Sequence, residues 1–160
     1  WQHVSHLLRW DLLRGDFCNL LESAEPPDLV FFDPFSYKTD GALWTGEIFS
    51  RIFRRCAPKS AELYTYSAST AVRATLLSAG FFVAEGVGTG PKTHTTIAFT
   101  RATEAASHPL SPRLLGQPWL ERWKRSSARF PPAMAENEKP YFESLVLSHP
   151  QFTTKFCAAD

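Results

Sequence analysis

An acid, a proline and an aromatic ring follow one another at residues 33–35, where the sequence is Asp-Pro-Phe. They end the apolar run of residues 29–32, which is typical of a strand covered on both faces. Open α/β sheets bind their ligands at the carboxyl ends of such strands. A carboxylate there can orient an amine and take up its proton, while a flat ring holds the amine in place. The triplet therefore favours transfer of a group onto nitrogen.

Each of these residues also has a plainer interpretation. Asp33 can cap the turn after a strand, and Phe35 can fill the core instead of stacking on a base. Pro34 fixes its backbone φ angle and stiffens the loop under either interpretation. A second acid, Asp16, can either bind a ligand or cap the short helix that is predicted to begin after it.

Composition limits the class of protein. The 160 residues suit one domain, and with 44% apolar residues the chain can bury a core. A net charge of +1 lacks the overall basic signature of many nucleic-acid binders. Cys18, Cys56 and Cys157 are widely spaced, which predicts reduced thiols in a cytoplasmic protein. The histidines lack ligand spacing, so we expect no metal site, and no apolar run reaches the length of a membrane span.

Strands and helices are predicted to alternate along the first 101 residues. Alternation and apolar runs predict strands over residues 8–14, 29–32, 61–66, 81–87 and 95–100. Helices are predicted between them after the capping residues Asp16, Thr45 and Ser69. This order is typical of a parallel α/β sheet, and the short loop before the last strand favours an antiparallel hairpin at one edge.

A change in composition follows residue 101. Residues 102–112 resemble a linker, and Pro118 is predicted to start a short helix with Trp119 and Trp123 stacked one turn apart. A further packing helix is predicted around residues 141–147. The sequence therefore predicts two parts: a sheet-containing domain at residues 1–101 and a helical extension of unknown role at residues 102–160.

Residues 33–45 resemble the signature of a known family. They are Asp-Pro-Phe-Ser-Tyr-Lys-Thr-Asp-Gly-Ala-Leu-Trp-Thr. This is similar to the Asp-x-Phe-x-Pro-x-x-Asn-Pro-x-x-Trp-Thr motif of the MnmC-type methyltransferase domain. Weaker likenesses follow the same order at residues 15–16, 66–69, 80–81 and 88–92, so that the resemblance covers residues 8–100.

The chain departs from the family pattern at three places. Tyr37 replaces the motif proline, Asp40-Gly41 replaces Asn-Pro, and Thr93-His94 replaces the Arg-Glu that follows the lysine. These departures leave the exact nucleoside open.

The resemblance implies a class I (Rossmann-like) methyltransferase sheet with strand order 3-2-1-4-5-7-6. On that scheme the chain lacks strands one and two, together with the glycine-rich cofactor loop and the ribose-binding acid. It begins with Trp rather than Met, so we expect a fragment of a longer protein. Because strand three would have no neighbour, its backbone groups would stay unpaired. We expect the fragment to be poorly stable and inactive by itself.

For the complete protein, the resemblance implies an S-adenosylmethionine-dependent N-methyltransferase. Its reaction would convert 5-aminomethyl-2-thiouridine to 5-methylaminomethyl-2-thiouridine at the tRNA wobble position. Asp33 would be the catalytic residue, and the cofactor would contact Asp16, Phe17, Asp33 and Pro34. Substrate would contact Phe35, Lys38, Trp44, Lys92 and His94; Trp44 has the alternative role of anchoring the loop behind Asp33, and the charged residues that of solvated surface.

Partners and rivals complete this interpretation. A flavin-dependent oxidase, fused or separate, would supply the aminomethyl substrate on tRNA. Alternative functions are N-methylation of another nucleobase or a small amine, and a non-catalytic methyltransferase-like scaffold. The basic group at residues 122–129 is either a solvated helix face or a further contact with RNA.

Overall fold

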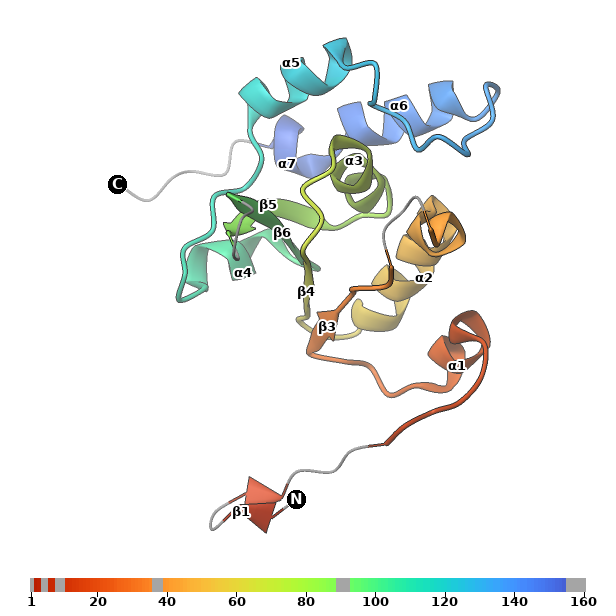
Figure 1. Ribbon diagram of the computed structural model, residues 1–160. Helices are drawn as coiled ribbons and strands as arrows, with labels where there is room; N and C mark the ends of the chain where they lie inside the picture. The colour runs from red at the N-terminus through yellow and green to blue at the C-terminus, as the bar shows by residue number, and fades with distance from the viewer. Residues whose placement is uncertain (1, 4–5, 8–10, 36–38, 89–92, 155–160) are drawn as a thin grey trace.

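The computed structural model describes residues 2–3, 6–7, 11–35, 39–88 and 93–154. Its centre is a four-stranded sheet of β3 (Leu29–Phe31), β4 (Glu62–Thr65), β5 (Phe82–Val87) and β6 (His94–Phe99), in the order β3-β4-β6-β5 (Figure 1). β3 and β4 are parallel, whereas β6 is antiparallel to both of its neighbours. This is the order implied for strands four to seven, so the Rossmann-like α/β fold class and the edge hairpin are confirmed.

Side chains alternate between the two faces of this sheet, as the period of two in a strand requires. Leu63, Val83 and Ala98 are buried on the face that packs against α2 (Gly46–Cys56) and α3 (Thr70–Ser78). Ile97 and Phe99 point to the opposite face. There they contact Ala105 of α4 (Ala102–Ser107). The helices α2 and α3 therefore cover one face of the sheet, and α4 covers part of the other; Figure 1 shows them on opposite sides of the strands.

The helix after Thr45 confirms its predicted cap and apolar face. The Ile48 N–H donates to Thr45 Oγ1 at 3.3 Å, and the helix buries Ile48, Phe49, Ile52 and Cys56. Burial raises the pKa of the Cys56 thiol to about 11, so this cysteine is a packing residue.

Asp16 likewise caps the predicted helix α1 (Phe17–Ser23), because its Oδ1 accepts the Asn19 N–H at 3.1 Å. Ser69 precedes α3 but makes no side-chain capping bond. Gly80 ends that helix with φ at +106°, and a Cβ there would lie 3.1 Å from the Phe53 ring. A short 3-10 helix, η1 (Gly41–Trp44), precedes α2.

The linker predicted at residues 102–112 is wrong over its first half, where α4 forms. Ala105 is buried against the sheet, and Glu104 accepts the Arg101 backbone N–H, so packing and capping stabilise a helix that composition did not predict. The helices predicted further on are present as α5 (Gln117–Arg125) and α6 (Lys139–Leu147), followed by α7 (Pro150–Thr153).

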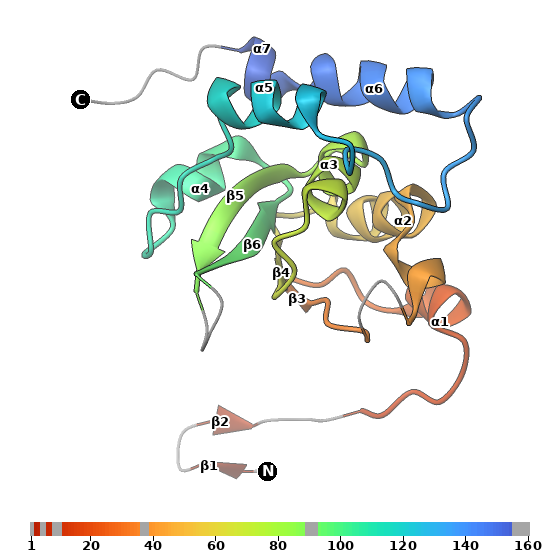
Figure 2. The same cartoon turned by 45° about the horizontal axis from the view of Figure 1, so that its top comes forward.

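Those three helices form a layer over α3, which Figure 2 shows above the sheet. The rings of Trp119 and Trp123 are stacked with their centroids 6.5 Å apart, which confirms the predicted stacking. Trp119 also stacks on Phe152 of α7. Buried residues of this layer belong to the same core as those of the sheet, so residues before and after residue 101 pack against each other. Among the described residues, no helix is long and apolar enough to cross a membrane.

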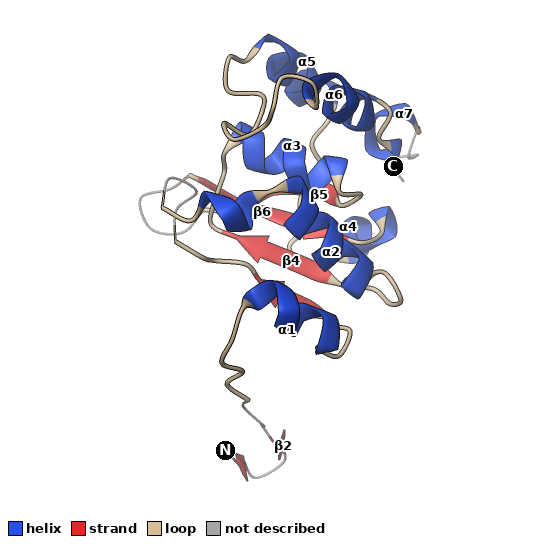
Figure 3. Cartoon of the chain, turned by 90° about the vertical axis from the view of Figure 1, so that its right-hand side faces the viewer, coloured by secondary structure: helices blue, strands red, loops and turns tan. Residues whose placement is uncertain are grey.

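The strand predicted at residues 8–14 is not found over residues 11–14, and residues 8–10 lie outside the described part. Leu12 is 88% exposed, and none of the described strands pairs with residues 11–14 to satisfy their backbone groups. Instead, β1 (Gln2–His3) and β2 (His6–Leu7) form a short antiparallel hairpin that lies apart from the sheet (Figure 3).

Candidate functional site

A hollow of about 500 Å³ opens at the carboxyl ends of β3 and β4. It is lined by Asp33, Pro34 and Phe35, which follow β3, by Asp40 from the loop before η1, and by Tyr66, which follows β4. Asp33 is exposed, and the Phe35 side chain is 77% exposed. The structure thus brings the predicted triplet together at the edge where α/β sheets bind ligands.

Phe32 fixes the position of this triplet. Its buried ring lies 5.1 Å from the Phe49 ring and 5.2 Å from the Trp44 ring, measured between centroids. Its backbone N–H continues the β3–β4 ladder by donating to Tyr64 O at 2.8 Å. Because side chains alternate along extended backbone, anchoring Phe32 inward turns Asp33 outward.

Trp44 holds the loop that follows Asp33. Its ring is buried, and its Nε1–H donates to the Phe35 carbonyl oxygen at 3.0 Å. The bond fixes the backbone at Phe35 while leaving that ring exposed. The structure therefore displays the anchoring role of Trp44, whereas its contact with substrate stays a prediction.

The start of α1 lies near the same edge. The Phe17 ring meets the Phe32 ring edge-on, with centroids 6.2 Å apart, so one buried ring links Phe17 to the base of the triplet. The Asp16 carboxylate caps α1 and is exposed. A cap and a cofactor contact are compatible, since a carboxylate has two oxygen atoms. The cofactor role of Asp16 and Phe17 stays a prediction.

Two lining residues were missed in the sequence. Tyr66 follows β4 directly, and the strand-end rule that selected Asp33 would also have selected it. Asp40 stands where the family motif has Asn. With Asp33 and Asp40 on one hollow, the site presents two carboxylates to its ligand, which favours a cationic group such as a sulfonium or an ammonium.

The predicted rim residues separate into two sets. Lys38 and Lys92 lie outside the described residues. His94 is exposed at the start of β6 and lines a second hollow, together with Arg73 and Arg122, rather than the hollow at Asp33. Any substrate that touches both His94 and Phe35 must therefore extend across the edge of the sheet.

Three comparisons place this geometry among known proteins. Residues 3–101 match the model of a family described as S-adenosyl-L-methionine-dependent methyltransferase. Over 79 residues, or 49% of the chain, it is 42% identical to the tRNA 5-methylaminomethyl-2-thiouridine biosynthesis bifunctional protein MnmC of Campylobacter hominis. The crystal structure of MnmC2 from Aquifex aeolicus superposes on 87% of the chain with a TM-score of 0.59 and 28% identity. The chain spans 12% and 43% of these two relatives.

Proposed function

This chain belongs to the family of S-adenosyl-L-methionine-dependent methyltransferases, and from that membership we propose that the whole protein methylates the wobble uridine of tRNA. The reaction would convert 5-aminomethyl-2-thiouridine to 5-methylaminomethyl-2-thiouridine. One observation carries the proposal: the Asp33-Pro34-Phe35 triplet lines an open hollow at a strand end, together with a second carboxylate. The name of the Campylobacter hominis relative supports this choice of nucleoside.

The family cofactor, S-adenosylmethionine, supplies an electrophilic methyl group on a sulfonium when it is bound. The residues present suit that charge, because Asp33 and Asp40 line one hollow and both are acidic. Asp16, Phe17, Asp33 and Pro34 would hold the cofactor.

Asp33 would act on the amine of the substrate. Its carboxylate would accept one N–H of the aminomethyl group and orient the nitrogen lone pair. As the nitrogen gains its fourth bond, it becomes cationic, and Asp33 would take up the proton that it then sheds. Because Asp33 is exposed at the hollow, it can meet a substrate without rearrangement of the core.

The remaining residues would hold the nucleotide. Phe35 offers a flat exposed ring on which an unpaired base can stack. Trp44 keeps the backbone of Phe35 in place and would border the substrate. Lys38, Lys92 and His94 would contact tRNA phosphates. A flavin-dependent oxidase, fused or separate, would supply the aminomethyl group, and the reaction would take place in the cytoplasm.

Nucleoside mass analysis tests this function. In tRNA from a strain that lacks the full gene, we expect the aminomethyl nucleoside to accumulate and its methylated form to disappear. The wild-type gene should restore the methylated form, and a gene with Asp33→Asn should not. An unchanged nucleoside profile in the deletion strain would contradict the proposal.

Asp40 favours a second candidate, N-methylation of another nucleobase or of a small amine. It replaces the family's Asn with a carboxylate inside the hollow, which suits a more strongly cationic substrate. Under this alternative, tRNA from the deletion strain keeps its methylaminomethyl nucleoside, and the purified protein methylates a free amine instead.

A further inference from the structure

A second hollow, of about 360 Å³, lies between the start of α3, the strands β5 and β6, and α5. It is lined mostly by polar and charged side chains, together with the indole rings of α5; its charged and titratable members are Arg73, Glu85, His94 and Arg122. His94 pairs with Val87 at the carboxyl end of β5, so the hollow lies at the same end of the strands as Asp33, although β3 and β5 are opposite outer strands of the sheet.

Arg73 is a fixed cation in the wall of this hollow. Its side chain is almost fully buried, and it donates from Nε to Thr96 Oγ1 at 3.0 Å and from Nη2 to the Thr95 carbonyl oxygen at 2.9 Å. Its third partner is Glu85, at 3.5 Å. Burial lowers the pKa of Arg73, and the Glu85 carboxylate opposes this effect. A guanidinium has five N–H donors, so these three bonds leave donors over.

Positive charge exceeds negative charge around Glu85. An adjoining hollow shares Glu85 and Arg122 and adds Arg113. Three arginines therefore surround one carboxylate, and the charge of Arg122 contributes to the lowered pKa of Arg73. Within the part of the chain that the structure describes, no hydrogen bond or ion pair holds the guanidinium of Arg122 or Arg113. The excess charge suits an anionic ligand.

We propose that this hollow binds a backbone phosphate of the RNA substrate, with the exposed Arg122 and the buried Arg73 as its two guanidinium donors. Guanidinium groups match phosphate oxygens in pairs, and His94 adds a ring N–H donor from β6. Arg122 belongs to α5, beyond the residues that the family model matches. The helical extension would thus complete the substrate surface. The inference rests on the proposed function, since it assumes an RNA substrate.

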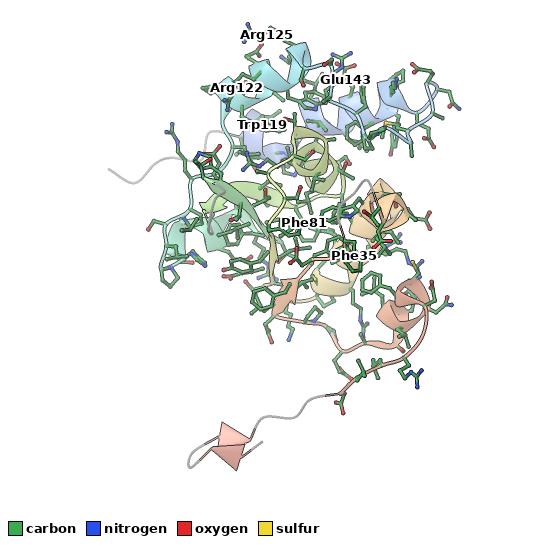
Figure 4. The ribbon with its side chains drawn as sticks, viewed as in Figure 1. Phe35, Phe81, Trp119, Arg122, Arg125 and Glu143 are labelled. Carbon is green, nitrogen blue, oxygen red and sulfur yellow. The ribbon has the colours of Figure 1, made fainter. Side chains whose placement is uncertain are left out.

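The test measures binding of an unmodified tRNA transcript to the full-length protein by fluorescence anisotropy, without cofactor, over a series of salt concentrations. Arg122→Gln should weaken binding about fivefold at low salt and reduce the salt slope by about one unit. Arg125→Gln is the matched control. Arg125 lies on the same helix, farther from the sheet, and its Nε donates to the Glu121 carbonyl oxygen (Figure 4). Both residues are exposed, so neither variant threatens folding.

Equal affinities and equal salt slopes for the two variants would overturn the inference. A second arm adds inorganic phosphate at constant ionic strength. If the two variants bind tRNA equally and only Arg122→Gln loses affinity for inorganic phosphate in calorimetry, the hollow binds free phosphate, and RNA is not its ligand. If phosphate lowers the tRNA affinity of Arg125→Gln toward that of Arg122→Gln, it competes with the RNA backbone for the hollow, and the inference is supported. Normal methylation of tRNA alongside equal variants would contradict this inference alone, whereas a wild-type protein that methylates no tRNA would contradict the proposed function.

Discussion

The sheet has two outer strands, β5 and β3, and among the described residues other segments of the chain cover the edge of β5 but not that of β3. At the β5 edge, residues 113–115 run alongside the strand: the Glu85 N–H donates to Arg113 O at 3.1 Å, and the Leu115 N–H donates to Val83 O at 2.9 Å. At the opposite edge, β4 is the one strand among those described that pairs with β3, and Phe31 is 75% exposed.

Gln151 completes the closed edge. Its Oε1 accepts the Val83 N–H at 2.7 Å, and its Nε2 donates to Val83 O at 2.9 Å and to Leu115 O at 2.8 Å. The side-chain amide therefore replaces a neighbouring strand at this point. Buried and satisfied backbone groups make an edge stable, whereas exposed groups leave it able to open. We therefore expect substitutions at the β5 edge to lower the free energy of unfolding, and substitutions at the end of β3 to lower turnover.

The largest expected effect is on turnover at the β3 edge. In the full-length protein, Asp33→Asn keeps the size of the side chain but removes its charge, and turnover should fall by roughly 10²-fold or more. The free energy of unfolding should be unchanged because Asp33 is exposed. Methyl transfer rates and urea titrations check both expectations.

Asp28→Asn is the matched control for this variant. Asp28 is an exposed acid just before β3, at the other end of the strand, where it pairs with Lys59 at 2.7 Å. The Asp28→Asn variant should keep the turnover of the wild type. Near-normal turnover in Asp33→Asn would reduce Asp33 to a residue that caps the turn.

The closed edge should respond in the opposite way. Gln151→Ala removes three buried hydrogen bonds and takes the side-chain partner from the Val83 N–H and the Leu115 carbonyl oxygen, whereas the Val83 carbonyl oxygen keeps the Leu115 N–H. The free energy of unfolding should therefore fall by about 2–3 kcal/mol. Turnover per folded molecule should change little. Gln117→Ala is the control, because exposed Gln117 makes a single bond to the Phe152 carbonyl oxygen. Equal destabilisation by the two variants would remove the special role of the β5 edge.

A smaller effect on turnover is expected at Phe35. Loss of a stacking ring costs about 1–3 kcal/mol per base, so Phe35→Ala should lower turnover by about tenfold at every salt concentration. Phe31→Ala serves as the control, since Phe31 is exposed to a similar degree but lies outside the hollow. If the two variants lose turnover equally, the loss in Phe35→Ala does not come from base stacking at the hollow.

The smallest effect concerns pH at the closed edge. His149 is buried, caps α7 by accepting the Gln151 N–H at its Nδ1, and has a pKa lowered by burial. The unfolded chain therefore binds more protons below about pH 6.5, and stability should decline as pH falls through that value. His149→Asn keeps an acceptor for the cap but cannot titrate. The stability of His149→Asn, measured by thermal unfolding between neutral and mildly acidic pH, should fall less steeply than that of the wild type. An identical fall in the two proteins would contradict a role of His149 in the pH dependence of stability.

The same contrast explains which features the sequence could predict. Local signals were sufficient for the caps at Asp16 and Thr45 and for the order of the four strands, because these depend on nearby residues and on family resemblance. The closed edge depends on partners far apart in the chain, such as Val83 and Gln151, and no periodicity records such contacts. The predicted strand at residues 8–14 fails over its described part for a related reason: alternation cannot supply a neighbouring strand.

The site divides in the same manner. Asp33, Pro34 and Phe35 follow from the strand-end rule, and so would Tyr66. The hollow around Arg73 could not be predicted from the sequence, because it forms only where α3, β5, β6 and α5 meet in the folded chain.

Transfer of a labelled methyl group tests the central claim most directly. Purified full-length protein would be incubated with methyl-labelled S-adenosylmethionine and tRNA that carries the aminomethyl uridine, and the nucleosides would then be separated. The account predicts label in the methylaminomethyl nucleoside with the wild type and with Asp28→Asn, and nearly none with Asp33→Asn. Absence of label from tRNA with the wild-type protein, or equal label with Asp33→Asn, would contradict it.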